Sequence, residues 1–280
     1  MRPKVLLRCK FKNPIAFCIV HWNAPDFLLL TVSQIELLYP NSKIYILDNE
    51  SEKINLTSIF SGLKKFNNIT LFAFSGCPKW AKKFRLDTTF EWQTHTAGLQ
   101  FLLNYSAKQL DEIAVFLDQD CILATGIDWF FSKFNKDILL IGARDRWRGH
   151  ACSHLIHPSF MILQPKRIHQ LFGDSSFYDE RTKSLEFYAR DPHHGISFKA
   201  LGHILYLEVR MHTKIPILTS YVYDETVYAW HAWYSSRLIG NNSVLDGYPI
   251  TWLKEVQKTE YDFMIQIHRN TTVDLSFQNK

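Results

Sequence analysis

Two aspartates separated by one residue, Asp118 and Asp120, are the strongest candidates for chemistry in this 280-residue sequence. They follow an apolar run, 113–117, that is typical of a buried strand. At a strand end both carboxylates can turn toward one site, where their oxygens suit Mg²⁺ or Mn²⁺, which often share coordination with substrate phosphates. The alternative is a turn in which an aspartate caps the strand end. The pair predicts a metal site that neutralises charge on a diphosphate.

Polar side chains also end two other predicted strands. The apolar run 15–21 leads through His21 to Asn23, and the run 43–47 leads to Asp48. In a parallel sheet, ligands bind beyond the carboxyl ends of the strands. We therefore expect these side chains to lie near the aspartate pair.

Strands and helices alternate in the first half of the sequence. Strands are predicted at 15–21, 43–47, 69–74 and 113–117, and helices at 26–37 and 88–110. This order is typical of βαβ units and predicts an α/β fold with a mostly parallel central sheet flanked by helices. The second half is less regular, with apolar segments at 138–142, 160–163 and 204–209. Neither a linker nor a repeat divides the sequence, so we expect a single domain, 1–280.

The sequence resembles the glycosyltransferases of the GT-A fold, and those of family 2 in particular. The resemblance rests on Ile19-Val20-His21-Trp22-Asn23, Ile46-Leu47-Asp48-Asn49-Glu50-Ser51 and Phe116-Leu117-Asp118-Gln119-Asp120, and it covers about residues 15–125 well. It implies a Rossmann-like, nucleotide-binding half at about 1–125 and an acceptor-binding half at about 126–280.

The resemblance also implies roles for individual residues. In this family the acid at the end of the second strand holds the base or ribose of the nucleotide, a place that Asp48 occupies. The end of the first strand contacts the nucleotide, which implicates His21 and Asn23. The central pair, Asp118 and Asp120, would bind the metal and the diphosphate of the donor.

Two late residues complete the site that the resemblance implies. Many GT-A enzymes bring a late histidine to the metal, and His231, between Trp230 and Trp233, suits that role best here. Its imidazole favours Mn²⁺ over Mg²⁺. Arg237 could bind the diphosphate bidentately. The alternatives are a packed histidine and a surface ion pair.

An inverting transfer needs a carboxylate that takes the proton of the acceptor hydroxyl. Asp191 is the first candidate for this base, with Asp179 and Glu180 as rivals. A turn before Pro192 would also explain Asp191. We expect inversion with Asp191 as the base, while a retaining transfer would not need it and the sequence leaves the stereochemistry open.

One segment departs from the family pattern before the aspartate pair. The family often carries an Asn-rich and Gly-rich segment there, and its nearest match is His95-Thr96-Ala97-Gly98. An ordinary stretch of helix explains these residues equally well.

Composition and motifs narrow the class of protein. The net charge of +5 comes from scattered lysines and arginines, which disfavours a nucleic-acid binder and suits a small anionic ligand. The P-loop, dinucleotide-binding and serine-hydrolase motifs are absent. The five cysteines show no disulfide spacing and we find no signal peptide, so we expect a cytoplasmic protein.

Zinc is disfavoured as the metal. The histidines His150, His154, His157, His193 and His194 resemble zinc spacing, but no HExxH motif occurs and the cysteines are wrongly separated. The segment 157–160 is instead expected on the wall of the pocket.

The leading hypothesis is a metal-dependent transferase that moves a sugar from a UDP- or GDP-sugar to a glycan, lipid-linked or other hydroxyl acceptor. Peripheral contact with a membrane is left open. One alternative is a non-catalytic glycan- or nucleotide-binding module on a transferase scaffold, because the base motif around Asp191 is imperfect. The other is a nucleotidyltransferase, which the absence of glycine between His21 and Pro25 disfavours.

Overall fold

A computed structural model of the chain describes residues 4–7, 14–49, 51–73, 90–134, 138–144, 156–172, 204–215, 218–232, 238–239, 242–243 and 250–278. The strands are β1 (Lys4–Leu7), β2 (Ile15–His21), β3 (Lys43–Asp48), β4 (Ile69–Ala73), β5 (Ile113–Asp118), β6 (Cys121–Leu123), β7 (Leu140–Arg144), β8 (Ile156–Leu163), β9 (Ile204–Met211), β10 (Thr219–Tyr223), β11 (Thr226–His231), β12 (Leu238–Ile239) and β13 (Asn242–Ser243). The helices are α1 (Pro25–Leu38), α2 (Lys53–Leu63), α4 (Phe90–Lys108), α5 (Asp128–Phe131), α6 (Pro165–Phe172) and α7 (Ile250–Gln278).

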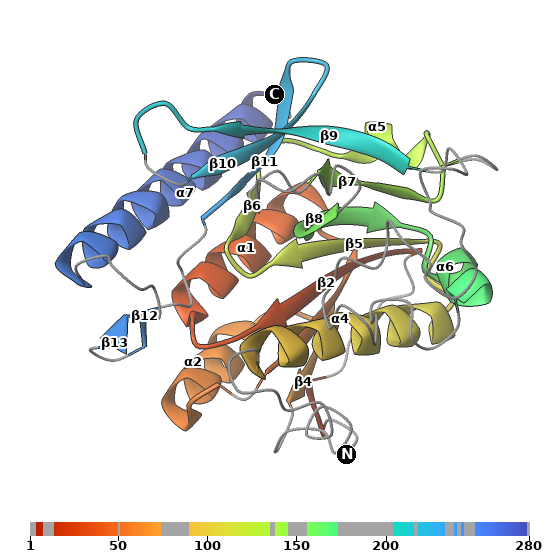
Figure 1. Cartoon of the computed structure of the whole chain (residues 1–280), viewed down its shortest axis with the longest axis horizontal. Helices are drawn as coiled ribbons and strands as arrows, with labels where there is room; N and C mark the ends of the chain where they lie inside the picture. Colours follow the sequence, from red (N-terminus) through yellow and green to blue (C-terminus); the bar gives the residue numbers. More distant parts are fainter. Residues whose placement is uncertain are drawn as a thin grey trace.

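Eleven of the strands form one mixed sheet in the order β1-β4-β3-β2-β5-β8-β7-β9-β10-β11-β6 (Figure 1). The segment β4-β3-β2-β5 is parallel, as the sequence predicts. The carboxyl ends of β2, β3 and β5 therefore lie at the same edge of the sheet.

The prediction of a mostly parallel sheet is wrong for the sheet as a whole. Most neighbouring pairs outside this segment are antiparallel, and only β7 with β9 is parallel among them. A buried strand has the same apolar sequence pattern whether it is parallel or antiparallel to its neighbours. The apolar segments at 138–142, 160–163 and 204–209 therefore did not indicate the orientation of these strands in the sheet. The described part of the chain has an α/β fold with a mixed central sheet.

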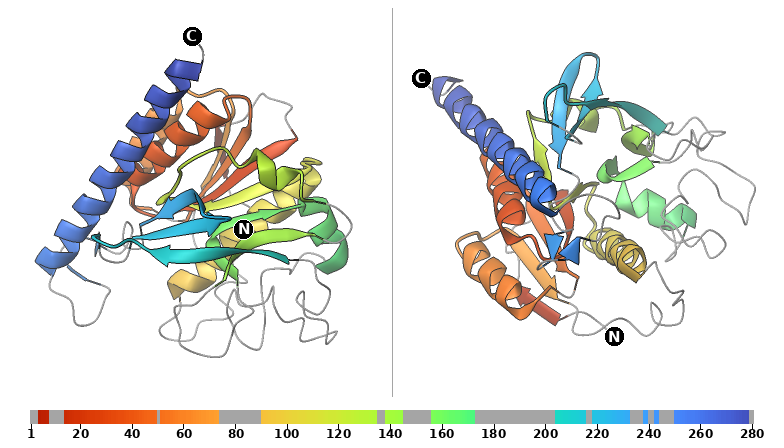
Figure 2. Two further views of the ribbon diagram at one scale, coloured as in Figure 1. Left: turned by 90° about the horizontal axis from the view of Figure 1, so that it is seen from above. Right: turned by 60° about the vertical axis from the view of Figure 1, so that its left-hand side comes forward.

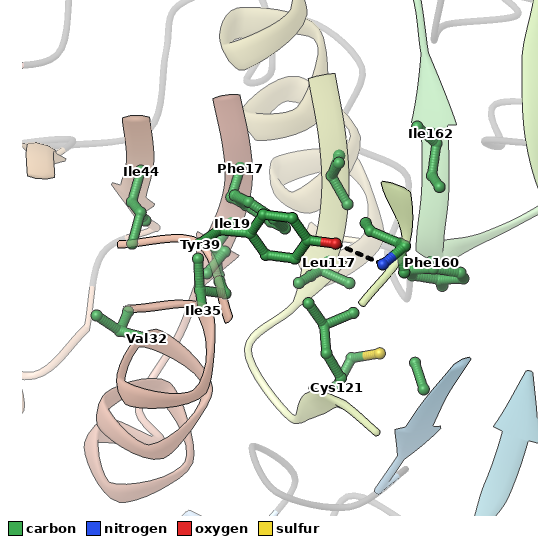
Figure 3. Packing of buried hydrophobic residues seen from close by; sticks show 14 of the residues in the cluster. Phe17, Ile19, Val32, Ile35, Tyr39, Ile44, Leu117, Cys121, Phe160 and Ile162 are labelled. Atoms are coloured by element: carbon green, nitrogen blue, oxygen red, sulfur yellow. Dashed lines mark hydrogen bonds between the residues drawn. The ribbon is translucent and has the colours of Figure 1, made fainter. Parts of the chain in front are cut away.

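Alternate residues of the central strands pack against opposite layers of helices. On β2, Phe17 and Ile19 belong to a core formed with α1 and α2, whereas Cys18 and Val20 belong to a core formed with α4 and α6. Figure 3 shows α1 placing Val32 against the first of these cores. Full burial of one such aliphatic side chain contributes about 1.5–3 kcal/mol relative to exposure. Burial on both faces explains why these strands read as continuous apolar runs.

The long helix α7 packs along the outer side of α1 (Figure 2). Its Met264 joins a third, smaller core with Phe27 of α1, Ile122 of β6 and Leu218. This contact ties the end of the chain to the first helix. In the part of the chain that the structure describes, no helix is both long and apolar enough to cross a membrane.

A buried ion pair fixes the opposite, amino-terminal ends of the parallel strands. Lys43, the first residue of β3, contacts Asp111, which precedes β5, and Ser106 donates a hydrogen bond of 2.7 Å to the same carboxylate. The side chain of Asp111 is fully buried. Burial raises the pKa of Asp111, while Lys43 and Ser106 lower it.

Replacing Lys43 with methionine should destabilise the fold by about 3–5 kcal/mol at neutral pH, because a buried charge loses its partner. Without Lys43 the pKa of Asp111 rises further. A carboxyl whose pKa is raised by folding contributes stability below its unfolded pKa and loses it as pH rises through the folded pKa. Urea unfolding of Lys43→Met should therefore show a smaller loss near pH 4 than near pH 7.

The surface ion pair of Arg210 with Glu225 provides the control, since both groups lie in solvent. Arg210→Met is expected to leave the free energy of unfolding nearly unchanged. A loss in Lys43→Met that matched this control, or that was the same at both pH values, would contradict the assignment.

Candidate functional site

The structure brings Asp118, Asp120 and His231 together at the carboxyl edge of the parallel strands. Asp118 ends β5, and β6 begins immediately after Asp120. Strand β11 pairs antiparallel with β6, which places His231 opposite Cys121. The amide of Ala232 donates a 2.9 Å hydrogen bond to the carbonyl of Asp120 and closes this junction.

The ligand atoms of these three residues face one another. His231 Nε2 lies 3.5 Å from Asp118 Oδ2 and 3.4 Å from Asp120 Oδ1. One ligand atom from each residue lies within 4.8 Å of the others. The side chains of Asp120 and His231 are nearly buried, at 8% and 4% exposure, while Asp118 is 18% exposed. Two convergent carboxylates and an imidazole are suitable ligands for a divalent cation. Because Asp118 is partly exposed, a ligand could approach the cation from its side.

The neighbouring Cys121 is fully buried in the apolar core. Burial raises the pKa of its thiol well above the ordinary value, and Asp118 and Asp120 raise it further. Cys121 packs in the apolar core, and the group of convergent ligand atoms among the described residues consists of the Asp118 and Asp120 carboxylates and the His231 imidazole.

His95 of α4 faces the other oxygen of Asp118. Its Nε2 lies 3.3 Å from Asp118 Oδ1, and the imidazole is 24% exposed. His95 stands outside the compact group of three, so it contacts the site through Asp118. From the sequence, the segment His95–Gly98 was only the nearest match to the family pattern. The structure gives its histidine a contact, because α4 places His95 beside Asp118.

Gly98, one turn after His95, lets α4 approach the sheet. A Cβ at this position would lie 2.9 Å from both methyl groups of Val20 and 3.1 Å from Leu47. Real Cβ atoms essentially never approach so closely, and the short valine side chain cannot move aside cheaply. The glycine therefore allows the helix to carry His95 up to Asp118.

Gln119 fastens the aspartate pair to the end of β2. Its Oε1 accepts a 2.7 Å hydrogen bond from the amide of Trp22, and its Nε2 donates one of 3.1 Å to the carbonyl of Trp22. The hydroxyl of Thr31 on α1 donates to the carbonyl of Gln119 at 2.9 Å. The residue between the two aspartates thus holds the loop from both sides.

His21 supports Asp48 rather than projecting from the sheet edge. The amide of Ala24 donates to His21 Nε2 at 3.1 Å, which places the ring hydrogen on Nδ1, 3.0 Å from Asp48 Oδ1. Ser51 adds its amide to Asp48 Oδ2 at 3.2 Å. His21 and Asp48 are 0% and 1% exposed, so the nucleotide contacts predicted for them would require the ligand to reach a nearly buried carboxylate.

Asn23 turns the chain at the end of β2 in a left-handed conformation, with φ of 49°. Asparagine tolerates this region better than most residues do. Its amide donates to the Ser51 hydroxyl at 2.9 Å, and its side-chain oxygen accepts from the amide of Glu52 at 2.8 Å and from Asn55 at 3.0 Å. Asn23 and Asp48 therefore lie in one hydrogen-bond network, formed through Ser51, that joins the ends of β2 and β3.

Several predicted residues lie outside the described part of the chain. They are the candidate bases Asp179, Glu180 and Asp191, the diphosphate-binding candidate Arg237, and the histidines His150, His154, His193 and His194. Their roles stay predictions.

Sequence reasoning did not identify Tyr221, which lies directly behind His231. Its hydroxyl is 3.3 Å from His231 Nδ1 and also contacts the hydroxyl of Ser159. Burial raises the pKa of Tyr221 well above its ordinary value. A regular hairpin turning at Asp224 and Glu225 would pair Tyr221 with Tyr228 and place it on the face opposite His231. The register irregularity between Tyr221 and Val222 instead pairs Tyr221 with Ala229, which puts it on the same face as His231, and no sequence pattern indicated this irregularity.

Neither a protein-family model nor a curated protein sequence matches the chain. The structure is similar to that of the galactosyltransferase LgtC in complex with donor and acceptor sugar analogs, at 13% identity over 68% of this chain and 72% of LgtC, with a TM-score of 0.46. It is also similar to the mannosyltransferase PcManGT from Pyrobaculum calidifontis in complex with GDP-Man and Mn²⁺, at 9% identity over 72% of this chain and 57% of that protein, with a TM-score of 0.43. The glycosyltransferase GlyE of Streptococcus pneumoniae TIGR4 matches at 13% identity over 69% of this chain and 44% of GlyE, with a TM-score of 0.42. At these low values we base the proposed function on the residues of the chain itself.

Gln119→Met keeps the size of the side chain but removes both hydrogen bonds to Trp22. We expect a loss of about 1–3 kcal/mol in the free energy of unfolding, because partly buried backbone groups lose their partners. Urea unfolding measures the loss. Gln109→Met, at an exposed position after α4, serves as the matched control. Equal stability of the two variants would refute the fastening role of Gln119.

Proposed function

We propose that the chain is a metal-dependent glycosyltransferase of the GT-A type that transfers a sugar from a nucleotide-diphosphate sugar to a hydroxyl acceptor. One observation supports the proposal above all. Asp118, Asp120 and His231 converge within 4.8 Å at the carboxyl edge of parallel strands, where α/β sheets bind ligands.

The donor set favours a small divalent cation. Two carboxylates suit both Mg²⁺ and Mn²⁺, and the imidazole of His231 favours Mn²⁺. When bound, the cation supplies a positive charge that stabilises the departing diphosphate. We assign Asp118, Asp120 and His231 to hold it.

The remaining residues bind and orient the donor in this proposal. We propose that Asn23 and Asp48, which follow or end β2 and β3, contact the nucleoside, with His21 holding Asp48 in place. Gln119 holds the aspartate loop against the end of β2. Arg237 is proposed to contact the diphosphate.

The acceptor half of the reaction is proposed from the sequence alone. We propose that Asp191 takes the proton of the acceptor hydroxyl in an inverting transfer. UDP- or GDP-sugars are the proposed donors, and a glycan or lipid-linked molecule is the proposed acceptor. We also propose that residues 1–125 and 126–280 act as the nucleotide-binding and acceptor-binding halves of one domain.

Calorimetry with UDP or GDP in the presence of Mn²⁺ tests the proposal. The unmodified protein should bind one of the two nucleotides, and Asp118→Ala combined with Asp120→Ala should abolish the binding because the cation that would neutralise the diphosphate loses two of its proposed ligands. Asp262→Ala, at an exposed position of α7, is the matched control and should bind normally.

Failure of both nucleotides to bind, or binding that survives the double substitution, would refute the proposal. Mass spectrometry then separates an enzyme from a binding module. A UDP- or GDP-sugar that binds but stays intact after long incubation with Mn²⁺ and candidate acceptors would favour the non-catalytic alternative.

His95 and His231 should differ in their effect on metal binding. Because His95 contacts Asp118 Oδ1 and lies outside the group of three, His95→Ala should raise the Kd for Mn²⁺ by about tenfold, the lower end of the range for outer contacts. His231→Ala should raise it more. Electron paramagnetic resonance, which detects free Mn²⁺, measures both values, and a larger effect of His95→Ala would reverse these assignments.

A further inference from the structure

Three polar side chains form a buried chain behind the proposed metal ligands. His231 Nδ1 lies 3.3 Å from the hydroxyl of Tyr221, and this hydroxyl contacts the hydroxyl of Ser159. Tyr221 and Ser159 are fully buried, and His231 is 3% exposed. The three groups come from three strands: β11, β10 and β8.

Aromatic packing fixes the position of the tyrosine ring in this chain. Tyr221 stacks on Phe160, with ring centroids 5.5 Å apart and an interplanar angle of 18°. The ring of His231 lies nearly parallel to that of Tyr221, at 6.2 Å and 21°. Phe160 pairs with Leu117 of β5, so the segment that carries Ser159 runs beside the strand that ends at Asp118. The hydroxyl of Tyr221 therefore has a defined place relative to the metal ligands.

The two nitrogens of His231 face different partners. Nε2 faces Asp118 and Asp120, whereas Nδ1 faces Tyr221. An imidazole that binds a cation through Nε2 must carry its hydrogen on Nδ1. That hydrogen needs an acceptor, and the oxygen of Tyr221 is in place. The hydroxyl of Tyr221 can then donate its hydrogen to the oxygen of Ser159. The two hydrogen bonds therefore run in the same direction, from His231 to Tyr221 and from Tyr221 to Ser159.

We propose that Tyr221, supported by Ser159, is a positioning residue that holds His231 with Nε2 directed at the cation site. The inference rests on the proposed function, because it assigns His231 to the cation. Tyr221 acts through His231 and does not itself contact the substrate.

Binding of Mn²⁺ alone, followed by electron paramagnetic resonance, tests the proposal without any measurement of activity. Tyr221→Phe removes only the hydroxyl and keeps the stacked ring. It should raise the Kd for Mn²⁺ by about tenfold, within the range found when outer partners of metal ligands are lost. Ser159→Ala should raise the Kd by less, because Tyr221 keeps its contact with His231.

Tyr45→Phe is the matched control. Tyr45 is a buried tyrosine whose hydroxyl lies 3.5 Å from Asp111, at the opposite end of the parallel strands. Its substitution removes the same atom far from the site and should leave the Kd unchanged. Thermal unfolding of each variant verifies that the fold is retained, and Ser159→Ala provides the test if Tyr221→Phe does not fold.

The double variant distinguishes a chain from two independent contacts. If Ser159 acts only through Tyr221, Tyr221→Phe combined with Ser159→Ala should bind Mn²⁺ as weakly as Tyr221→Phe alone. Independent, multiplying effects would overturn the role proposed for Ser159.

Two results would overturn the role of Tyr221, and they differ in what they say about the function. Normal Mn²⁺ binding by both Tyr221→Phe and Ser159→Ala, together with weakened binding by His231→Ala, would reject the positioning role and leave the proposed function intact. Absence of Mn²⁺ binding in the unmodified protein would reject both.

Discussion

The parallel pairing of β2 with both β3 and β5 is the constraint on which the candidate site depends. Pairing in register brings His21 beside Asp48 and Val20 beside Asp118, so three strands end together. The backbone groups of these strands are satisfied within the sheet, and both faces are covered by helices. The polar side chains at the strand ends are therefore held on a rigid and buried support.

Hydrogen bonds between the loops at this edge of the sheet fix the positions of the strand-end residues. Gln119 joins the aspartate loop to β2, Ser51 joins β3 to the turn at Asn23, and Ala232 joins β11 to Asp120. Each link connects segments that are distant in the sequence. Because a buried polar group without a partner costs about 1–3 kcal/mol, loss of any one of these links would be unfavourable, and together they restrict the positions of the carboxylates.

The first half of the fold and the position of the aspartate pair could be predicted from the sequence. Continuous apolar runs identify β2, β3, β4 and β5, and the helices predicted at 26–37 and 88–110 favour parallel connections, whereas α2 between β3 and β4 was not predicted. The direction of the later strands could not be predicted, since apolar runs do not encode it. For the same reason, neither the contact of Tyr221 with His231 nor the pairing of β6 with β11 could be predicted, because both depend on how strands pair with one another. The role of His21 as a support for Asp48 was missed for another reason: residue type alone does not distinguish a buried histidine from one that binds a ligand.

The pairing of β6 with β11 has a consequence for the order in which the molecule folds. Contacts within β2, α1, β3 and β4 close short loops, whereas His231 meets Asp118 and Asp120 only after a very long segment of chain has been closed. Closing longer loops costs more entropy, and contacts between distant segments form slowly. The hydrogen-bonded turn at Asn23 and Asp48 can therefore take shape early, while the cluster of Asp118, Asp120 and His231 is completed among the last events of folding.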